Sequence, residues 1–211
     1  MKSKKLYHRF VQLLLLLIII VTLNSCGFCN VFSKHYYFTG NGGVRPGKTK
    51  FDLSKDIYVL KKEDFIKTNV VYQSCSKWNK EALRYEATDC SDPTATISFI
   101  RFFENGRVLI NTISDDKLPL DQYNNLEGGT VGYYKIEENE LIIEYFSVNI
   151  GGMTSDCGKY YIDKYKFSSD GIELQEIRRS DNGIFYGWRK VEHSVPYIKK
   201  GINGLKGDPT W

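Results

Sequence analysis

The stretch "TISFIRFFENGRVLINTI", Thr96–Ile113, decides the fold expected for this chain. Two runs rich in β-branched and aromatic residues flank the dipeptide Asn105-Gly106. Residues of these types favour strands. Asn-Gly between two such runs is a strong hairpin signal, because a two-residue turn of the required hand needs positive φ at both positions. The stretch therefore predicts an antiparallel β-hairpin.

The same arrangement recurs further along the chain. "TVGYYKIEENELIIEYFSVN" turns at Glu138-Asn139, and "KYYIDKYKFSSDGIELQEIRR" turns at Asp170-Gly171. Further strands are expected at "DIYVL" (56–60), "VVYQSC" (70–75) and "GIFYGWRKVEH" (183–193). Eight or nine short strands joined by tight turns are typical of a sandwich or barrel. We therefore expect an all-β chain, an antiparallel up-and-down meander that forms a barrel or curled sheet.

Two segments depart from simple alternation of apolar and polar residues. "LIIEYF", residues 141–146, is apolar on both faces apart from Glu144, which predicts a strand that is central or covered on both sides. "NKEALRYEA", residues 79–87, is the only stretch with helix-like composition. It predicts one short helical insertion between strands.

Within residues 56–193, tyrosine doublets occur at Tyr133-Tyr134 and Tyr160-Tyr161. Because successive side chains of a strand point to opposite faces, one ring of each doublet should face inward and the other outward. Such rings line ligand cavities or contact surfaces, but they also fill cores and favour strands. Both interpretations stay open at this point.

The N-terminus has the pattern of an export signal. The first ten residues, "MKSKKLYHRF", hold four basic side chains and no acidic one, and an apolar run follows from Leu13 to Val21. This run is shorter than the roughly 20 residues that a membrane-spanning helix needs. A basic segment, a short apolar run and small residues before a cut site predict a secretory signal peptide over residues 1–25.

The end of this signal resembles the lipobox of bacterial lipoproteins. Leu23-Asn24-Ser25-Cys26 places an aliphatic residue and small or polar residues before a cysteine. The resemblance implies cleavage between Ser25 and Cys26, with lipid attached to Cys26. Gly27 stands where many lipoproteins retained in the inner membrane have Asp. We therefore expect a protein anchored in the cell envelope, in the outer membrane.

Removal of the signal also changes the charge balance. The whole chain has 29 basic and 25 acidic residues, a formal charge of +4. The signal contains four of the basic residues and none of the acidic ones, so the remaining chain is formally neutral. Because nucleic-acid-binding domains keep a basic excess, no nucleic-acid partner is expected.

After the signal, the composition divides the chain into three segments. Residues 26–55 are rich in Gly and polar residues and predict a flexible tether, and residues 56–193 contain the strand signals. Residues 194–211 contain Pro and Gly without periodicity and predict a C-terminal tail, either docked or loose. The middle segment has the size of one domain.

The hairpins resemble the lipocalin-like domains of Bacteroidetes lipoproteins. The shared pattern is a Phe followed by a turn Gly, a G-x-Y strand with an Asn turn, and a closing D-G-I-x-L hairpin. The matching residues here are Phe103, Gly106, Gly132, Tyr134, Asn139, Asp170, Gly171 and Leu174. The resemblance covers roughly residues 96–179 and implies a lipocalin-like barrel on an envelope lipoprotein.

One motif suggests a different function. "GGVRPGKT", Gly42–Thr49, fits the G-x-x-x-x-G-K-[ST] pattern of nucleotide-binding loops. Such a loop needs a helix directly after it, so that the helix N-terminus can bind phosphate, whereas strand-like sequence follows Thr49. Pro46 also removes one backbone N–H that could bind a phosphate oxygen. We therefore expect a tether and no nucleotide, with a nucleotide binder as a remote alternative.

Catalytic and metal-binding patterns are not found in the sequence. His35 and His193 have no partner at a metal-ligand spacing, and no G-x-S-x-G is present. No cofactor, metal or catalytic residue is therefore expected. We expect a module that binds an apolar small molecule or another envelope protein. The alternative is an exported enzyme with catalytic residues dispersed along the chain, because triads form in space.

The cysteines beyond the anchor region predict a disulfide. An exported chain meets an oxidising compartment, in which free thiols tend to pair. Cys75 ends one expected strand, and Cys90 precedes the next. We expect the bridge Cys75–Cys90, with pairings of either residue to Cys157, or a fully reduced chain, as the alternatives.

Overall fold

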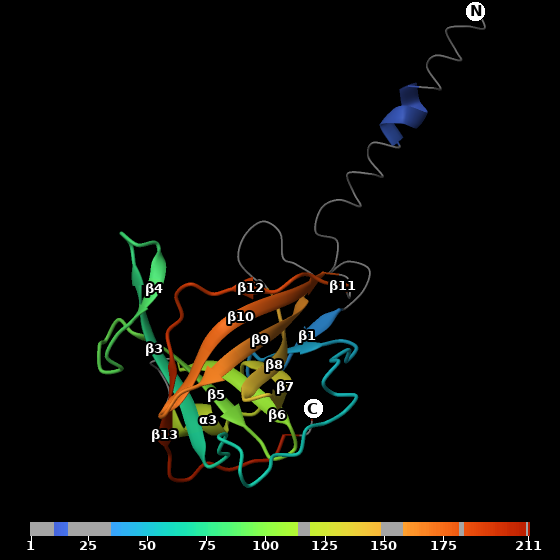
Figure 1. Ribbon diagram of the computed structural model, residues 1–211. Coiled ribbons are helices and arrows are strands. Elements are labelled where there is room, and N and C mark those ends of the chain that lie inside the picture. The colour runs from blue at the N-terminus through green and yellow to red at the C-terminus, as the bar shows by residue number, and fades with distance from the viewer. Residues whose placement is uncertain (1–10, 17–34, 114–118, 149–157, 182–183, 210) are drawn as a thin grey trace, which may run out of the picture.

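The computed structural model describes residues 11–16, 35–113, 119–148, 158–181, 184–209 and 211 (Figure 1). The predicted cleavage and lipidation site at Ser25 and Cys26 lies outside the described residues, as does Cys157. Residues 11–16 are helical. Among the described residues, no helix has both the length and the apolar composition that crossing a membrane requires.

The protein is all-β, as predicted, and its main feature is a closed antiparallel barrel of eight strands. The strands follow one another around the ring in chain order, which makes the meander up-and-down. They are β3 (Val70–Asn79), β5 (Thr96–Phe102), β6 (Arg107–Ile113), β7 (Thr130–Glu137), β8 (Glu140–Ser147), β9 (Lys159–Phe167), β10 (Gly171–Asp181) and β13 (Tyr197–Gly201). Pairing of β13 with both β10 and β3 closes the ring.

All three predicted hairpins are present, but their turns differ. Glu138 and Asn139 both have positive φ, 50° and 65°, as expected for a two-residue turn between β7 and β8. Between β5 and β6, only Gly106 has positive φ, and the Phe103 N–H donates to the Arg107 carbonyl. This loop has three residues and ends in a glycine bulge, so the expected two-residue turn at Asn105-Gly106 is wrong.

The prediction of a helical insertion at residues 79–87 is also wrong. These residues turn back along β3 to form β4 (Arg84–Ala87), and Trp78 packs edge-on against Tyr85 at 5.2 Å between ring centroids. Backbone pairing with β3 therefore outweighs the modest helix propensity of the segment. In the described part of the barrel domain, a short helix, α3 (Pro119–Asn124), lies instead between β6 and β7.

Residues 56–60, expected to be a strand, run without regular structure past the turn between β5 and β6. The Leu60 N–H donates to the Glu104 carbonyl, and a side chain on Gly106 would collide with the Tyr58 backbone. Tyr58 and Leu60 pack against the core inside the barrel. This segment therefore covers one end of the barrel.

The C-terminal boundary of the barrel also differs from the expectation. The strand predicted at residues 183–193 is reduced to two short pieces beside β10, β11 (Ile184–Phe185) and β12 (Arg189–Lys190). The last barrel strand is β13, within residues 194–211, which were expected to be a tail. Its five residues are too few for periodicity to be recognised, but both neighbouring strands supply backbone partners.

The described part of the expected tether is folded onto the barrel. A hairpin forms from β1 (Tyr36–Phe38) and β2 (Val44–Pro46), and β2 pairs with the start of β7. Phe51 is buried with Tyr133 and Phe146 on the outside of the barrel. The segment covers the outer face of β8, which explains why the sequence of that strand is apolar on both faces.

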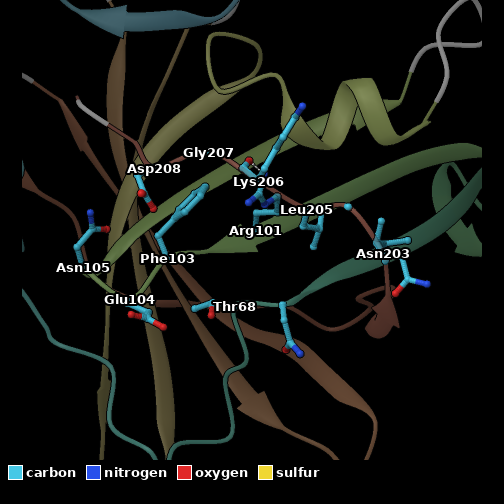
Figure 2. Close-up of a pocket in the computed structure, with 13 residues that line it drawn as sticks. Thr68, Arg101, Phe103, Glu104, Asn105, Asn203, Leu205, Lys206, Gly207 and Asp208 are labelled. Atoms are coloured by element: carbon cyan, nitrogen blue, oxygen red, sulfur yellow. Dashed lines mark hydrogen bonds between the residues drawn. The ribbon is translucent and has the colours of Figure 1, made fainter.

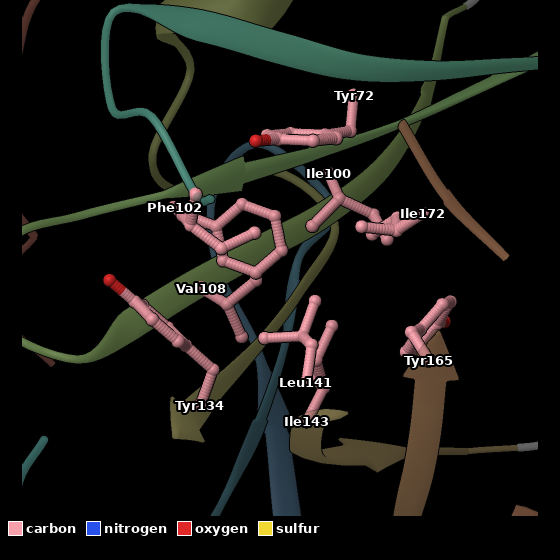
Figure 3. Packing of buried hydrophobic residues seen from close by; sticks show 10 residues of the cluster. Tyr72, Ile100, Phe102, Val108, Tyr134, Leu141, Ile143, Tyr165 and Ile172 are labelled. Atoms are coloured by element: carbon pink, nitrogen blue, oxygen red, sulfur yellow. The ribbon is translucent and has the colours of Figure 1, made fainter. Parts of the chain in front are cut away.

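The main core fills one half of the barrel interior (Figure 3). Tyr72, Phe102 and Tyr134 form edge-on ring contacts at 4.9–5.2 Å, and aliphatic residues of β8 and β10 complete the packing. A second cluster lies outside β3, β5, β6 and β7, beneath α3 and the C-terminal residues Ile202, Leu205 and Trp211. We call the filled half of the interior, with Tyr58, Leu60 and Ile66 at its end, the closed half.

Candidate ligand cavity in the barrel

The other half of the barrel, which we call the open half, contains a cavity of about 640 Å³. Side chains from all eight barrel strands line it, so the cavity lies inside the ring. Its lining combines aromatic and aliphatic side chains with a set of small hydroxyl groups. These are Ser74, Ser76, Thr96, Ser98, Thr130 and Ser147.

Side-chain size along the strands determines where the cavity begins. On β3 the interior side chain at Tyr72 is followed, two residues on, by Ser74. On β5 the closed half has Phe102 and Ile100, and the next interior residue is Ser98. Large side chains fill a protein core to high density and leave few voids. A serine side chain is much smaller than a ring or a branched aliphatic group, so the interior stays unfilled where the strands present serine.

Among the described residues that line the cavity, Asp163 is the only one with an acidic side chain. It lies in the middle of β9 and is only 4% exposed. The Tyr165 hydroxyl donates to its Oδ2 at 3.3 Å, and the Tyr145 hydroxyl is a second hydrogen-bonding neighbour. Oδ1 has no hydrogen-bond partner among the described residues. Burial raises the pKa of this carboxyl group to about 7, although both tyrosine hydrogen bonds oppose the change.

Three tyrosines surround this carboxyl group. Tyr145, Tyr165 and Tyr197 come from β8, β9 and β13, and burial raises the pKa of each above its ordinary value. The Tyr145 ring stacks on Tyr161 at 5.4 Å, while Tyr165 and Tyr197 meet edge-on at 6.3 Å. The hydroxyls stay protonated at neutral pH, so they can donate to the carboxylate.

The predicted disulfide between Cys75 and Cys90 is present, beside the open half. Cys75 lies on β3 between two cavity-lining serines, and Cys90 lies in the connection from β4 to β5. The bridge holds that connection against β3, together with the hydrogen bond from the Thr88 N–H to the Cys75 carbonyl. Arg84 and His193 are at the cavity border, and Arg84 is paired with Glu86 at 2.8 Å.

A second hollow, of about 690 Å³, lies on the outside of the barrel between the turn after β5 and residues 202–208 (Figure 2). Arg101 is buried beneath it and donates to the carbonyls of Tyr123 and Lys206. Its guanidinium group also lies 4.8 Å from the centre of the Phe103 ring. These contacts attach α3 and the C-terminal segment to the barrel. We therefore assign Arg101 a structural role.

The nucleotide-loop pattern at Gly42–Thr49 has no matching structure. Its central residues form β2, no helix follows within residues 47–60, and the Lys48 carbonyl accepts a hydrogen bond from Tyr160. Within the described ranges, no group of three or more His, Cys, Asp or Glu side chains is arranged to hold a metal ion.

The aromatic doublets divide as predicted. Tyr134 joins the interior core and Tyr161 stacks on cavity-lining Tyr145, while Tyr133 and Tyr160 belong to the outer cluster under the N-terminal segment. Sequence reasoning missed Asp163. Its signal was an acidic residue at an interior position, between Tyr161 and Tyr165, in an otherwise aromatic face.

A scan of the chain against protein-family models finds no matching family, and no match is found among curated proteins or solved structures.

Proposed function

We propose that this protein is a lipid-anchored lipoprotein of the outer membrane whose barrel binds a small molecule in its open half. The observation that carries the proposal is the cavity of about 640 Å³ inside the ring, bordered by all eight strands. Ligand sites are concave and of roughly 300–1,000 Å³, with mainly apolar walls and a few polar groups that orient the ligand. The resemblance to lipocalin-like lipoprotein domains supports the same function.

The lining narrows the class of ligand. Aromatic and aliphatic walls at Tyr145, Leu174 and Tyr197 suit an apolar body, while the serine and threonine hydroxyls suit polar substituents. The purely apolar ligand expected from the sequence would leave these hydroxyls without ligand partners. We therefore propose an amphipathic small molecule.

Blocking the cavity tests this function. Ser98→Phe places a ring in the open half, whereas Lys166→Phe places the same ring on an exposed position of β9. The full chain, purified from membranes in detergent, is examined by native mass spectrometry. We expect a small molecule bound to the wild type and to Lys166→Phe, and none bound to Ser98→Phe. A molecule retained by Ser98→Phe would contradict cavity binding.

The anchor is tested separately. Cys26→Ala should abolish incorporation of a labelled fatty acid, while Cys29→Ala, three residues away, should retain it. A label that persists on the Cys26→Ala protein would contradict lipidation at this residue.

An exported enzyme remains the second candidate, because one observation favours it. A buried carboxyl group with a pKa of about 7 can accept or donate a proton at neutral pH. The test is turnover of a panel of esters and glycosides by the wild type, with Asp163→Asn as the control that should be inactive.

A further inference from the structure

The geometry of the open half points to a ligand cation: we propose that Asp163 accepts a hydrogen bond from an ammonium group of the ligand, so that the cavity selects small amines with an apolar body. This inference rests on the proposed binding function and specifies its ligand. It begins from Asp163, which lines the cavity and whose buried Oδ1 has no hydrogen-bond partner among the described residues.

A buried carboxylate without a cationic partner is unfavourable. Ionised side chains inside proteins are nearly always paired, because desolvation costs several kcal/mol per ion. The neighbours of Asp163 that act on its pKa are tyrosines, with no lysine, arginine or histidine among them. The adjacent cation, Lys164, pairs with Glu140 and Glu176 on the opposite face of the strand. A cationic ligand would supply the missing partner.

A comparison with Glu144 shows that burial alone does not make a carboxyl group a candidate ligand site. Glu144 is fully buried on β8, and its Oε1 also has no partner within the described ranges, but its Oε2 accepts the Leu53 N–H at 2.8 Å. Phe51 and Leu53 cover it on the outside of the barrel. Glu144 lines neither of the two cavities described above. Asp163 combines an unpartnered oxygen with a cavity large enough for a ligand.

The surroundings of Asp163 also suit an ammonium group. Tyr145, Tyr165 and Tyr197 provide aromatic rings around the carboxyl group, and aromatic faces attract cations when solvent is excluded. Arg84, at the border, is already compensated by Glu86. The hydroxyls of Ser74 and Ser98 can accept the remaining ammonium hydrogens or donate to other ligand groups.

Three probes of similar shape separate charge from shape: 2-phenylethylamine, 2-phenylethanol and 3-phenylpropionate. Binding to the purified full chain in detergent is measured by calorimetry at pH 8. We expect the amine to bind about tenfold or more tightly than the alcohol, and the carboxylate to bind weakest. Asp163→Asn should weaken amine binding about tenfold or more and change alcohol binding less than about twofold. The exposed-turn variant Asp170→Asn should bind all three probes as the wild type does.

A second measurement needs no change at Asp163. Near pH 6.5 the carboxyl group is partly protonated, so amine binding should release protons, which calorimetry in buffers of different ionisation enthalpy detects. The other titratable groups that line the cavity are four tyrosines, one histidine and one arginine: Tyr85, Tyr145, Tyr165, Tyr197, His193 and Arg84. Proton release should therefore persist in His193→Asn and be absent for the alcohol.

The outcomes separate the inference from the function on which it rests. Equal binding of amine and alcohol, or no amine binding by the wild type, would overturn the inference. An affinity for amine that Asp163→Asn leaves unchanged would also overturn it. None of these results affects the cavity test, because the Ser98→Phe experiment follows the molecule that the protein carries from the cell.

Discussion

The closed and open halves of the barrel are built from the same strands but are filled differently. In the closed half, β3 and β5 present Tyr72, Ile100 and Phe102, which are fully buried in the core. In the open half, the same strands present Ser74 and Ser98 to a cavity. Pairing of the backbone continues through both halves without regard to side-chain size. Different residues of a single strand can therefore contribute to stability and to ligand binding.

The largest effect is expected from a truncation in the closed half. Phe102→Ala removes a ring packed against Tyr72 and Tyr134, and it should lower the free energy of unfolding by about 3–5 kcal/mol. Denaturant unfolding followed by tyrosine fluorescence measures the loss. A loss below about 1 kcal/mol would mean that the closed half is not the stabilising core.

The open half should depend on its disulfide. Replacing Cys75 and Cys90 together by Ser opens a bridge with a sequence separation of 15, and it should cost about 3 kcal/mol in the chain-entropy model. Hydrogen exchange should rise first in β4 and the start of β5, and the closed half should change least. Non-reducing peptide mapping of the wild type provides the control. A peptide joining either cysteine to Cys157 would contradict the pairing.

Asp163 in the open half should make the free energy of unfolding depend on pH. Burial raises its pKa from 3.8 to about 7, so the folded chain holds the proton more tightly than the unfolded chain. The contribution of Asp163 to stability is then fully present below about pH 4 and is lost as the pH rises towards 7. Asp163→Asn should be more stable than the wild type at pH 8, by about 1–3 kcal/mol, and equal to it near pH 4. Unfolding curves at both pH values decide this. A difference independent of pH would contradict the assignment.

The smallest effect is expected from a cavity-lining serine. Ser98→Ala removes a hydroxyl group that faces the cavity and should change the free energy of unfolding by less than about 0.5 kcal/mol. The same measurement as for Phe102→Ala applies, so the two variants compare both halves on one strand. A loss as large as that of Phe102→Ala would show that the open half is packed as tightly as the closed half.

Local patterns predicted much of this fold. The paired aromatic and β-branched runs and the turn residues Glu138-Asn139 identified the hairpins, because turn geometry acts over a few residues. "LIIEYF" correctly indicated a covered strand. In contrast, β13 and the segment over the closed half owe their conformation to partners far away in the sequence. Residues 79–87 were misread because backbone pairing with β3 outweighs their helix propensity.

The candidate site was less accessible from the sequence. The spacing of Cys75 and Cys90 predicted their bridge, since the two residues flank one short connection. The cavity depends on interior positions being small on several strands at the same level, which requires knowledge of the strand register. The sequence "YIDKYKF" does not show that Asp163 is buried with an unpartnered oxygen. That environment results from the positions of Tyr145 and Tyr165 in space.

The position of β13 determines when the barrel can close during synthesis. It lies between β3 and β10, the first and last of the other barrel strands in chain order, and pairs Ile198 with Gln73. Until residue 201 has left the ribosome and any export channel, the segments of both strands that pair with β13 have unpaired backbone groups. Exposed edges invite pairing with other chains, and contacts between distant residues form slowly. A chaperone that shields β3 and β10 would therefore be most valuable in the interval between their emergence and the arrival of β13.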